Sequence, residues 1–242
     1  MRSPRATGEV ATPVGRRVFL GMVGLGAAGV VVGSSVQRWV AAALRPVTSV
    51  SGGGVSALIP GEDRFRIYTV TDSLPSMPTS QYRLSVTGLV ERPLELSFDQ
   101  LKGMPSTTLV RDFQCVTGWR VAKVRWDGVL ISTLLDEAGV LPSARALRFD
   151  SFDGVYTESL TLDQARRPDV IAAYGFEGGP VTSQHGGPVR LHVAPMYGYK
   201  SCKWLSGIRV VDRVEPGYWE QNGYDIDAWV GRSNGRDDAP TS

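Results

Sequence analysis

The chain has 242 residues, of which 42% are hydrophobic and 21% charged, the composition of a globular protein long enough to bury its own core. Its formal net charge of +2 is uneven: six basic residues and one acidic residue precede position 46, so 20 basic and 23 acidic residues follow, a charge of −3. A slightly acidic body argues against a nucleic-acid partner, and two cysteines with two histidines exclude zinc-finger and iron–sulfur spacing.

The N-terminal segment has the layout of a targeting sequence. Arg16-Arg17 is followed by Val18-Phe19-Leu20 and then by an uncharged apolar run over residues 21–36. Paired arginines before x-Phe-Leu resemble the twin-arginine export signal, and the run is also long enough to span a membrane. Residues 1–45 are therefore interpreted as an export signal or as an N-terminal membrane anchor over residues 18–36. Either reading puts the body in the periplasm or on the extracytoplasmic face of the membrane.

Composition divides the rest of the chain. Residues 46–61 contain a Gly-Gly-Gly run and are predicted to be a flexible linker. The folded domain is expected over residues 62–231, and the polar residues 232–242 are expected to form a disordered tail. At the start of the domain, alternation over 65–71 and 82–90 predicts two strands, after which Ser97 has the side chain of a helix N-cap.

Cys115 lies between an alternating, strand-like run and a turn made by Thr117-Gly118. Its thiol is therefore expected at a strand end, where a ligand can reach it. A lone cysteine is more often a buried apolar side chain, so this position by itself does not identify a site. Beyond it, residues 126–129 are predicted as a turn and residues 130–138 as a helix ended by Gly139.

The middle of the domain predicts short strands joined by turns. Residues 146–156 read as a strand that enters an Asp-Gly turn, in the manner of a hairpin, and Ser151 beside that turn is a turn-forming residue type. A short helix is expected over 160–167, a strand over 170–174 and a turn with a loop over 176–180.

The stretch from 185 to 205 carries a second pattern. A Gly-Gly-Pro turn leads into an alternating strand and then into a Gly-containing loop with Lys200 and Lys203. Exposed amides and ammonium groups suit a phosphate, although solvated lysines on a hairpin would give the same pattern. His192 has no motif partner and is read as a core or surface histidine. A closing strand is expected over 204–214, and an aromatic-rich segment from Glu215 is expected to fold back over the domain.

Two segments of the chain resemble the molybdopterin-binding core of the sulfite oxidase family. The first is Gln114-Cys115-Val116-Thr117-Gly118-Trp119 with Trp126-Asp127-Gly128-Val129, and the second is His185-Gly186-Gly187-Pro188-Val189-Arg190 with Tyr197-Gly198-Tyr199-Lys200-Ser201-Cys202-Lys203. Animal and plant sulfite oxidases tend to read Cys-x-Gly-Asn-Arg-Arg at the cysteine, so the departure points to the bacterial branch, which includes periplasmic protein-methionine-sulfoxide reductases. The resemblance implies an α+β fold, a mixed β-rich domain with short helices. It also implies a molybdenum-molybdopterin cofactor and an oxidoreductase that performs sulfoxide reduction or sulfite-type oxidation.

The resemblance assigns roles position by position. Cys115 is expected to be the catalytic residue and the protein ligand of molybdenum, a role that suits a soft thiolate. The residues expected to bind the cofactor are Arg66, Tyr68, Ser151, His185, Arg190, Ser201, Cys202 and Lys203. From the residues alone, Arg66 is an exposed charge, Tyr68 a half-buried aromatic and Cys202 a structural thiol.

The substrate is expected to be a small molecule or a protein sulfoxide. Because the chain has no haem-attachment motif, electrons are expected to pass to or from a separate redox partner such as a membrane haem protein. The chain ends too soon after residue 214 for the immunoglobulin-like dimerisation domain of sulfite oxidases, so a monomer is expected.

Two alternatives remain open from the sequence. One is a thiol enzyme with Cys115 as nucleophile and His185 as base, and the other is a non-catalytic exported domain of the same fold. A Cys115–Cys202 disulfide, which an exported protein could form, would remove the metal ligand.

Overall fold

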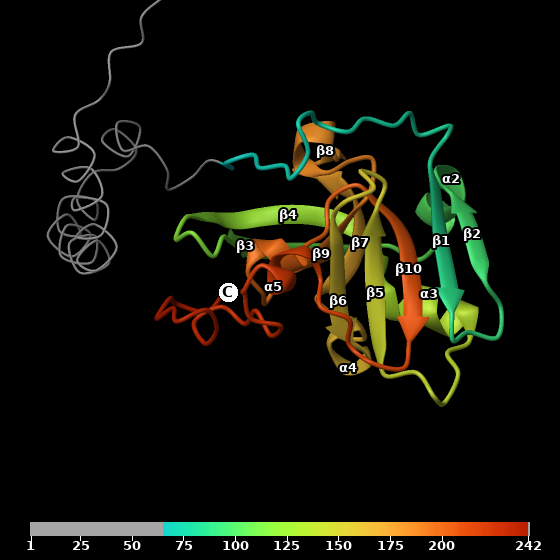
Figure 1. Cartoon of the computed structure of the whole chain (residues 1–242). Coiled ribbons are helices and arrows are strands. Elements are labelled where there is room, and N and C mark those ends of the chain that lie inside the picture. Colours follow the sequence, from blue (N-terminus) through green and yellow to red (C-terminus); the bar gives the residue numbers. More distant parts are fainter. Residues whose placement is uncertain (1–64, 242) are drawn as a thin grey trace, which may run out of the picture. The chain divides into compact units, whose positions relative to one another are not determined.

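A computed structural model describes residues 65–241 of the chain. The predicted export signal or anchor and the predicted linker lie outside these residues. Within the described range, no helix is long and apolar enough to cross a membrane. The described elements form one mixed and one antiparallel sheet, with short helices in the connections between strands, so the expected β-rich α+β class is confirmed (Figure 1).

The first sheet has five strands in the order β2-β1-β10-β5-β6. These strands are β1 (Arg83–Gly88), β2 (Leu94–Ser97), β5 (Ala146–Ser151), β6 (Thr157–Thr161) and β10 (Leu205–Val211). The pairing of β1 with β10 is parallel and the others are antiparallel. The C-terminal closing strand therefore inserts between an N-terminal hairpin and a central one.

The second sheet is antiparallel in the order β3-β4-β7-β8, with β9 paired to the free part of β7. Its strands are β3 (Thr107–Gln114), β4 (Arg120–Leu130), β7 (Val170–Phe176), β8 (Gly179–Pro180) and β9 (Arg190–Val193). The helices are α2 (Phe98–Gly103), α3 (Ile131–Ala138), α4 (Leu162–Ala165) and α5 (Tyr218–Gln221), and two 3₁₀ turns are η2 (Ser183–His185) and η3 (Gly198–Lys200).

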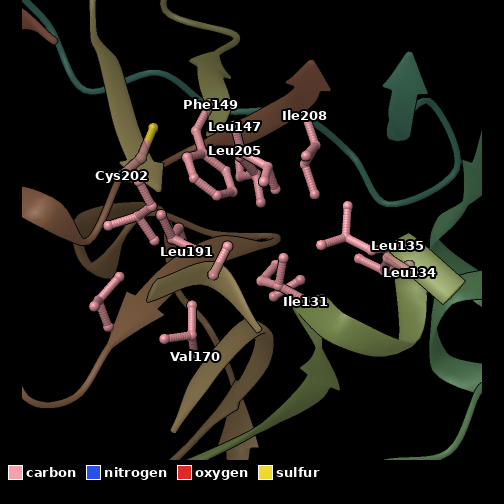
Figure 2. Close-up of a cluster of buried hydrophobic side chains, with 14 of the residues drawn as sticks. Ile131, Leu134, Leu135, Leu147, Phe149, Val170, Leu191, Cys202, Leu205 and Ile208 are labelled. Carbon is pink, nitrogen blue, oxygen red and sulfur yellow. The ribbon is translucent and has the colours of Figure 1, made fainter. Parts of the chain in front are cut away.

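Strand alternation in β7 separates two hydrophobic clusters. Val170 and Ala172 belong to the large core between the sheets, whereas Ile171 and Ala173 belong to a smaller cluster on the opposite face. Successive residues of a strand point to opposite faces, so a strand buried on both sides must be apolar throughout. Figure 2 shows the large core, where side chains of α3 meet those of β5, β7 and β10.

Several local signals predicted the structure correctly. Ser97 caps α2 in a capping box, because its hydroxyl accepts from the amide of Gln100, whose side chain accepts from Ser97 in return. Helix α3 ends at Gly139, which has the left-handed backbone (φ 69°) of a helix C-cap. The Asp153-Gly154 turn joins β5 to β6 as the expected hairpin.

Two segments differ from expectation. Residues 65–71, predicted as a strand, pair with no sheet edge; instead Phe65 packs against Phe113 and Trp126 of the smaller cluster. Residues 126–129, predicted as a turn, continue β4 through an irregularity of register between Asp127 and Gly128. The Asp-Gly pair is used here to bring β7 close, since a Cβ at Gly128 would lie 2.3 Å from the Ala172 carbonyl oxygen.

The C-terminal part folds back over the domain as expected. α5 begins the aromatic segment, and the tail that follows it contacts the body in the structure. Tyr197 donates to Asp238 (2.9 Å), and the amide nitrogen of the Asn234 side chain donates to the Tyr199 hydroxyl (2.9 Å). Residues 232–241, for which composition predicted disorder, therefore include side chains held by hydrogen bonds.

The close approach at Gly128 gives a first prediction. Gly128→Ala should lower the free energy of unfolding by about 1–3 kcal/mol, because β7 must move away from β4 to admit a methyl group. Gly103→Ala, at the end of α2 where an added Cβ meets nothing within 4 Å, is the matched control and should leave stability unchanged or slightly raised. Denaturant unfolding of both variants measures the difference, and equal midpoints would contradict the close packing of these strands.

Candidate functional site

A cavity of about 440 Å³ among the described residues, which we call the main cavity, contains most of the predicted site residues. Its walls come from seven places in the chain: residues 65–70, the end of β3 with the loop after it, Tyr156, η2, Arg190 at the start of β9, the loop 198–204, and α5 with Tyr224. Most of these wall segments are loops or short turns set on the ends of strands. This is the usual arrangement of a ligand site, in which a rigid sheet positions variable loops.

Cys115 opens into this cavity directly after β3. Its backbone amide donates to the Trp119 carbonyl oxygen (2.9 Å) and its carbonyl accepts from Gly118 (3.0 Å), which closes a tight turn. The thiol is half-buried, is not in a disulfide, and lies 3.2 Å from the Thr117 hydroxyl. The prediction of an accessible thiol at a strand end is confirmed.

Arg190 lies beneath the cavity because of strand alternation in β9. Leu191 and Val193 point into the large core, so Arg190 and His192 point the other way, toward the rings of Phe113 and Trp126. The guanidinium donates to the carbonyl oxygens of His185 (2.8 Å), Leu191 (3.2 Å) and Ser201 (2.8 Å). Burial lowers the pKa of Arg190 to about 10, which still leaves it charged at neutral pH.

Lys203 is the second cation of the cavity wall. Its ammonium donates to the Tyr68 carbonyl oxygen and lies 4.3 Å from the centroid of the Trp204 ring. Burial, followed by repulsion from Arg190, lowers the pKa of Lys203 to about 8. Within residues 65–241, neither Arg190 nor Lys203 forms an ion pair with a carboxylate. Two partly or fully buried cations without counter-ions are suited to an anionic ligand.

His185 packs among aromatic rings. Its imidazole stacks on Phe176 (centroids 4.3 Å apart) and meets Phe65 edge-on (5.0 Å). Burial, with Arg190 and Lys203 nearby, lowers the pKa of His185, and its Nδ1 has no hydrogen-bond partner among the described residues. In the described part of the chain, no hydrogen bond joins His185 to Cys115.

His192, read from the sequence as a core or surface histidine, is a core residue. It is buried between Phe113 and Trp126, and burial next to Arg190 lowers its pKa to about 3. The imidazole is therefore neutral.

The structure brings most of the sequence-predicted residues together. The cavity is lined by Arg66, Tyr68, Cys115, His185, Arg190, Ser201 and Lys203. Ser151 and Cys202 are absent from its described walls. Ser151 accepts from the Asp153 amide and so serves the turn (3.1 Å), and Cys202 is buried in the large core, near Phe149 and Leu191 (Figure 2).

An aromatic wall was missed by the residue-level predictions. It consists of Tyr156, Tyr199, Tyr218, Trp219 and Tyr224, which come from three separate parts of the chain. Only the aromatic richness of residues 218–224 was visible in advance, and the sequence could not show that Tyr156 would lie opposite them. The two rings of Tyr156 and Tyr218 stack at 5.8 Å.

A second hollow of about 460 Å³ lies beside the main cavity and shares Val116, Thr117 and Tyr224 with it. Its other walls are polar and come from residues 223–225 and 234–236, including Arg236. The loop that carries Cys115 therefore separates an aromatic cavity from a polar hollow.

Comparison with known proteins gives a consistent result. A model of the oxidoreductase molybdopterin binding domain matches residues 71–219. The chain is 35% identical over 171 residues to the uncharacterized oxidoreductase YuiH of Bacillus subtilis, a match that covers 66% of this chain and 86% of YuiH. It is 32% identical to the protein-methionine-sulfoxide reductase catalytic subunit MsrP of Gluconobacter oxydans, covering 58% of this chain and 50% of MsrP.

Matches to other relatives agree. Sulfite oxidase of Arabidopsis thaliana is 28% identical over 177 residues, covering 59% of this chain and 45% of that enzyme. The crystal structure of the sulfane dehydrogenase SoxCD from Paracoccus pantotrophus superposes with a TM-score of 0.53 at 26% identity, covering 58% of this chain and 41% of that one. The chain thus spans about half the length, or less, of several of these relatives.

The titration of Lys203 gives a second prediction. Sulfate, whose charge is constant across this range, should bind the cofactor-free chain below pH 8 and more weakly as pH rises through 8, because the ammonium then loses its proton. Lys203→Gln should bind sulfate weakly at every pH, whereas Lys102→Gln on the surface of α2 should behave as the parent. Calorimetric titration at several pH values measures this, and pH-independent binding by the parent chain would contradict the assignment.

Proposed function

This chain belongs to the oxidoreductase molybdopterin-binding domain family and is a molybdopterin-dependent oxidoreductase, and we propose that it transfers oxygen atoms or electrons at a Cys115-ligated molybdenum outside the cytoplasmic membrane. The observation that carries the proposal is the position of the thiol. Cys115 lines the aromatic, cation-bearing cavity, and the next two residues, Val116 and Thr117, line both this cavity and the polar hollow. Cys115 would hold the metal in the main cavity, beside the polar hollow through which a substrate would approach.

The residues of the main cavity fit molybdopterin. The ligand has a flat heterocycle and an anionic phosphate end, and the cavity offers aromatic rings together with the unpaired cations Arg190 and Lys203. The buried Nε1 of Trp119 has no acceptor among the described residues, so a donor remains for a polar heteroatom. When bound, the molybdenum centre supplies two-electron oxygen-atom transfer.

The chain's own groups have separate tasks in this proposal. Cys115 provides a soft thiolate ligand, and the Thr117 hydroxyl, 3.2 Å from its sulfur, can donate to it and reduce its electron density. Lys203 holds the anionic end by charge. Arg190 acts less directly than the sequence suggested, because it fastens the loops of His185 and Ser201 to each other through their carbonyl oxygens. The hydroxyl of Ser201 is likewise occupied, accepting from the Val193 amide (3.0 Å).

The polar hollow supports a substrate with a polar oxo group. Arg236 lies near the Cys115 turn, since a Cβ at Gly118 would be 3.9 Å from a guanidinium nitrogen of Arg236. A cation in this place can donate to a sulfoxide or attract a sulfite-type oxyanion. Reduction of a protein or small-molecule sulfoxide is the first candidate, on the likeness to MsrP, and oxidation of a sulfite-type anion is the second, on the likeness to sulfite oxidase.

Electrons would then be exchanged with a separate redox protein. Protein sulfoxide substrates and a partner such as a membrane haem protein both require a site that opens at the surface, as the hollow does. We also propose that the chain is monomeric. Its export would depend on a twin-arginine signal within residues 1–45.

The ligand role of Cys115 gives a third prediction. Cys115→Ser should retain the fold and much of the pterin but lose nearly all turnover, because a harder oxygen ligand alters the redox chemistry at the metal. Cys202→Ala should keep its activity, since that thiol lies in the core away from the cavity walls. Molybdenum content, fluorescence of the released and oxidised pterin, and turnover of methionine sulfoxide and of sulfite with artificial electron carriers are measured together.

The outcomes of that experiment separate the candidates. A parent protein that contains neither molybdenum nor pterin would overturn the proposal, and so would a Cys115→Ser protein with unchanged metal spectra and rates. The substrate that is turned over distinguishes sulfoxide reduction from sulfite-type oxidation.

A fourth prediction concerns export. Replacing Arg16 and Arg17 by lysine should leave the folded protein in the cytoplasm, because the twin-arginine route recognises the arginine pair. Cell fractionation and immunodetection measure the distribution. Unchanged export of the lysine variant would exclude this route.

A further inference from the structure

A buried ionic cluster lies behind the aromatic wall and takes no part in the proposed chemistry. The Lys200 ammonium donates to Glu158 Oε1 (2.5 Å) and to Glu220 Oε1 (2.7 Å). The side chains of all three residues are at most 1% exposed. Lys200, which the sequence offered as a phosphate ligand beside Lys203, is fully engaged here.

The charges of this cluster do not balance. Two carboxylates face one ammonium, and the second oxygens, Glu158 Oε2 and Glu220 Oε2, find no hydrogen-bond donor among the described residues. An uncompensated buried charge is costly, and a proton shared between the two carboxyl groups would remove that cost. Burial raises the pKa of Glu158 well above its usual value, and the neighbouring Glu220 raises it further against the opposing effect of Lys200.

The cluster joins the aromatic wall to the body of the domain. Glu158 is on β6 and Lys200 is in η3, whereas Glu220 is on α5. Tyr218 and Trp219 of the same short helix line the main cavity, as does Tyr224 after it. We call residues 217–224 the aromatic cap.

Gly217, the first residue of the aromatic cap, packs closely against β6. A Cβ at Gly217 would lie 2.6 Å from the Thr157 carbonyl oxygen and 2.7 Å from Glu220 Oε2. Only glycine allows this approach of the cap to β6, and the approach places Glu220 against Glu158.

We propose that Glu220 is a positioning residue, which latches the aromatic cap over the main cavity through Lys200 and Glu158, and that lifting the cap releases the proton that the two carboxyl groups share. The site under the cap is the cofactor cavity, and this part rests on the proposed function. The latch itself is a property of the chain with or without a cofactor.

The sign of the pH dependence follows from that proton. In the lifted cap both carboxyl groups are in water, where a glutamic acid has a pKa of about 4.3, so the proton is lost at neutral pH. In the closed cap the two carboxyl groups retain this proton. The closed form is therefore favoured at low pH and is progressively weakened as pH rises from about 5 toward the raised pKa of Glu158.

Other titratable groups near the cluster do not change charge in this window. Burial raises the pKa of Tyr156, Tyr199 and Cys202, so they stay neutral, and Arg190 stays charged with a pKa of about 10. Asp225 also faces Tyr199 and contributes to the rise in its pKa. Lys203, whose pKa is about 8, lines the same cavity but donates to the Tyr68 carbonyl oxygen, and its effect is common to the parent and the Glu158→Gln variant. The ionic cluster itself consists of the two glutamates and Lys200.

The test is amide hydrogen exchange of residues 218–224 in the whole, cofactor-free chain. Glu158→Gln imitates the protonated acid, because its amide can donate to the unpartnered Glu220 oxygen. The ratio of parent to Glu158→Gln exchange rates cancels the intrinsic effect of pH, and it should rise about tenfold per pH unit above pH 5 until the raised pKa is reached. Glu95→Gln, an exposed change on β2, is the matched control and should give a constant ratio.

A second variant tests the latch independently of pH. The double change Glu158→Gln with Glu220→Gln strands the Lys200 ammonium without a carboxylate and should raise exchange in the cap by about a hundredfold or more, while the strands of the first sheet keep their protection. If the double variant destabilises the whole chain instead, the pH dependence of the ratio of parent to Glu158→Gln exchange rates still tests the proposal. A ratio that does not change with pH overturns the proposal.

The cofactor part has its own readout. In cofactor-loaded protein, the rate at which pterin is lost on gel filtration should rise in the double variant and, for the parent, with pH. Faster amide exchange in the cap without faster pterin loss would retain the latch and refute the placement of the cofactor beneath it. Absence of pterin from the parent would refute the proposed function and leave the latch result standing.

Discussion

The site depends on one buried guanidinium. Arg190 is held below the cavity by the alternation of β9, and it donates to backbone carbonyls on the two loops that form the cavity walls. Burying an arginine between Phe113 and Trp126 is favourable only if its hydrogen bonds are satisfied and its charge is solvated by dipoles or rings. The loops of His185 and Ser201 supply those carbonyl groups, so the charge and the loop positions stabilise each other.

Cations near the cavity are used in two different ways. Lys203 has backbone and ring contacts but no carboxylate partner in the described chain, which leaves its charge available to an anion. Lys200, three positions earlier, is bound to two buried carboxylates and cannot serve a ligand. Two lysines of one loop therefore differ in role: Lys203 is available to an anionic ligand, whereas Lys200 holds the aromatic cap. The difference arises because β6 and α5 place carboxylates against Lys200.

The family match does not include all of the residues that line the main cavity and the polar hollow. The family match spans residues 71–219, yet residues 65–70 and Tyr224 line the cavity and Arg236 lines the hollow beside it. The walls of both hollows are therefore built partly from segments outside the matched region. Differences of substrate between family members can arise in such segments without altering the sheets that hold Cys115 and Arg190.

The sequence by itself determined the features that depend on near neighbours. Alternation, the Ser97 cap and the Gly139 stop predicted local elements because they are fixed by backbone geometry, and the motifs around Cys115 and Arg190 predicted the family. The tertiary structure decided what depends on distant partners. Residues 65–71 alternate like a strand but find no sheet edge, residues 126–129 carry a turn signal but lie inside β4, and Glu158 meets Lys200 and Glu220 only because β6, η3 and α5 converge. Local propensity is worth a fraction of a kcal/mol to about 1 kcal/mol per residue, which packing against another strand or a buried ion pair readily overrides.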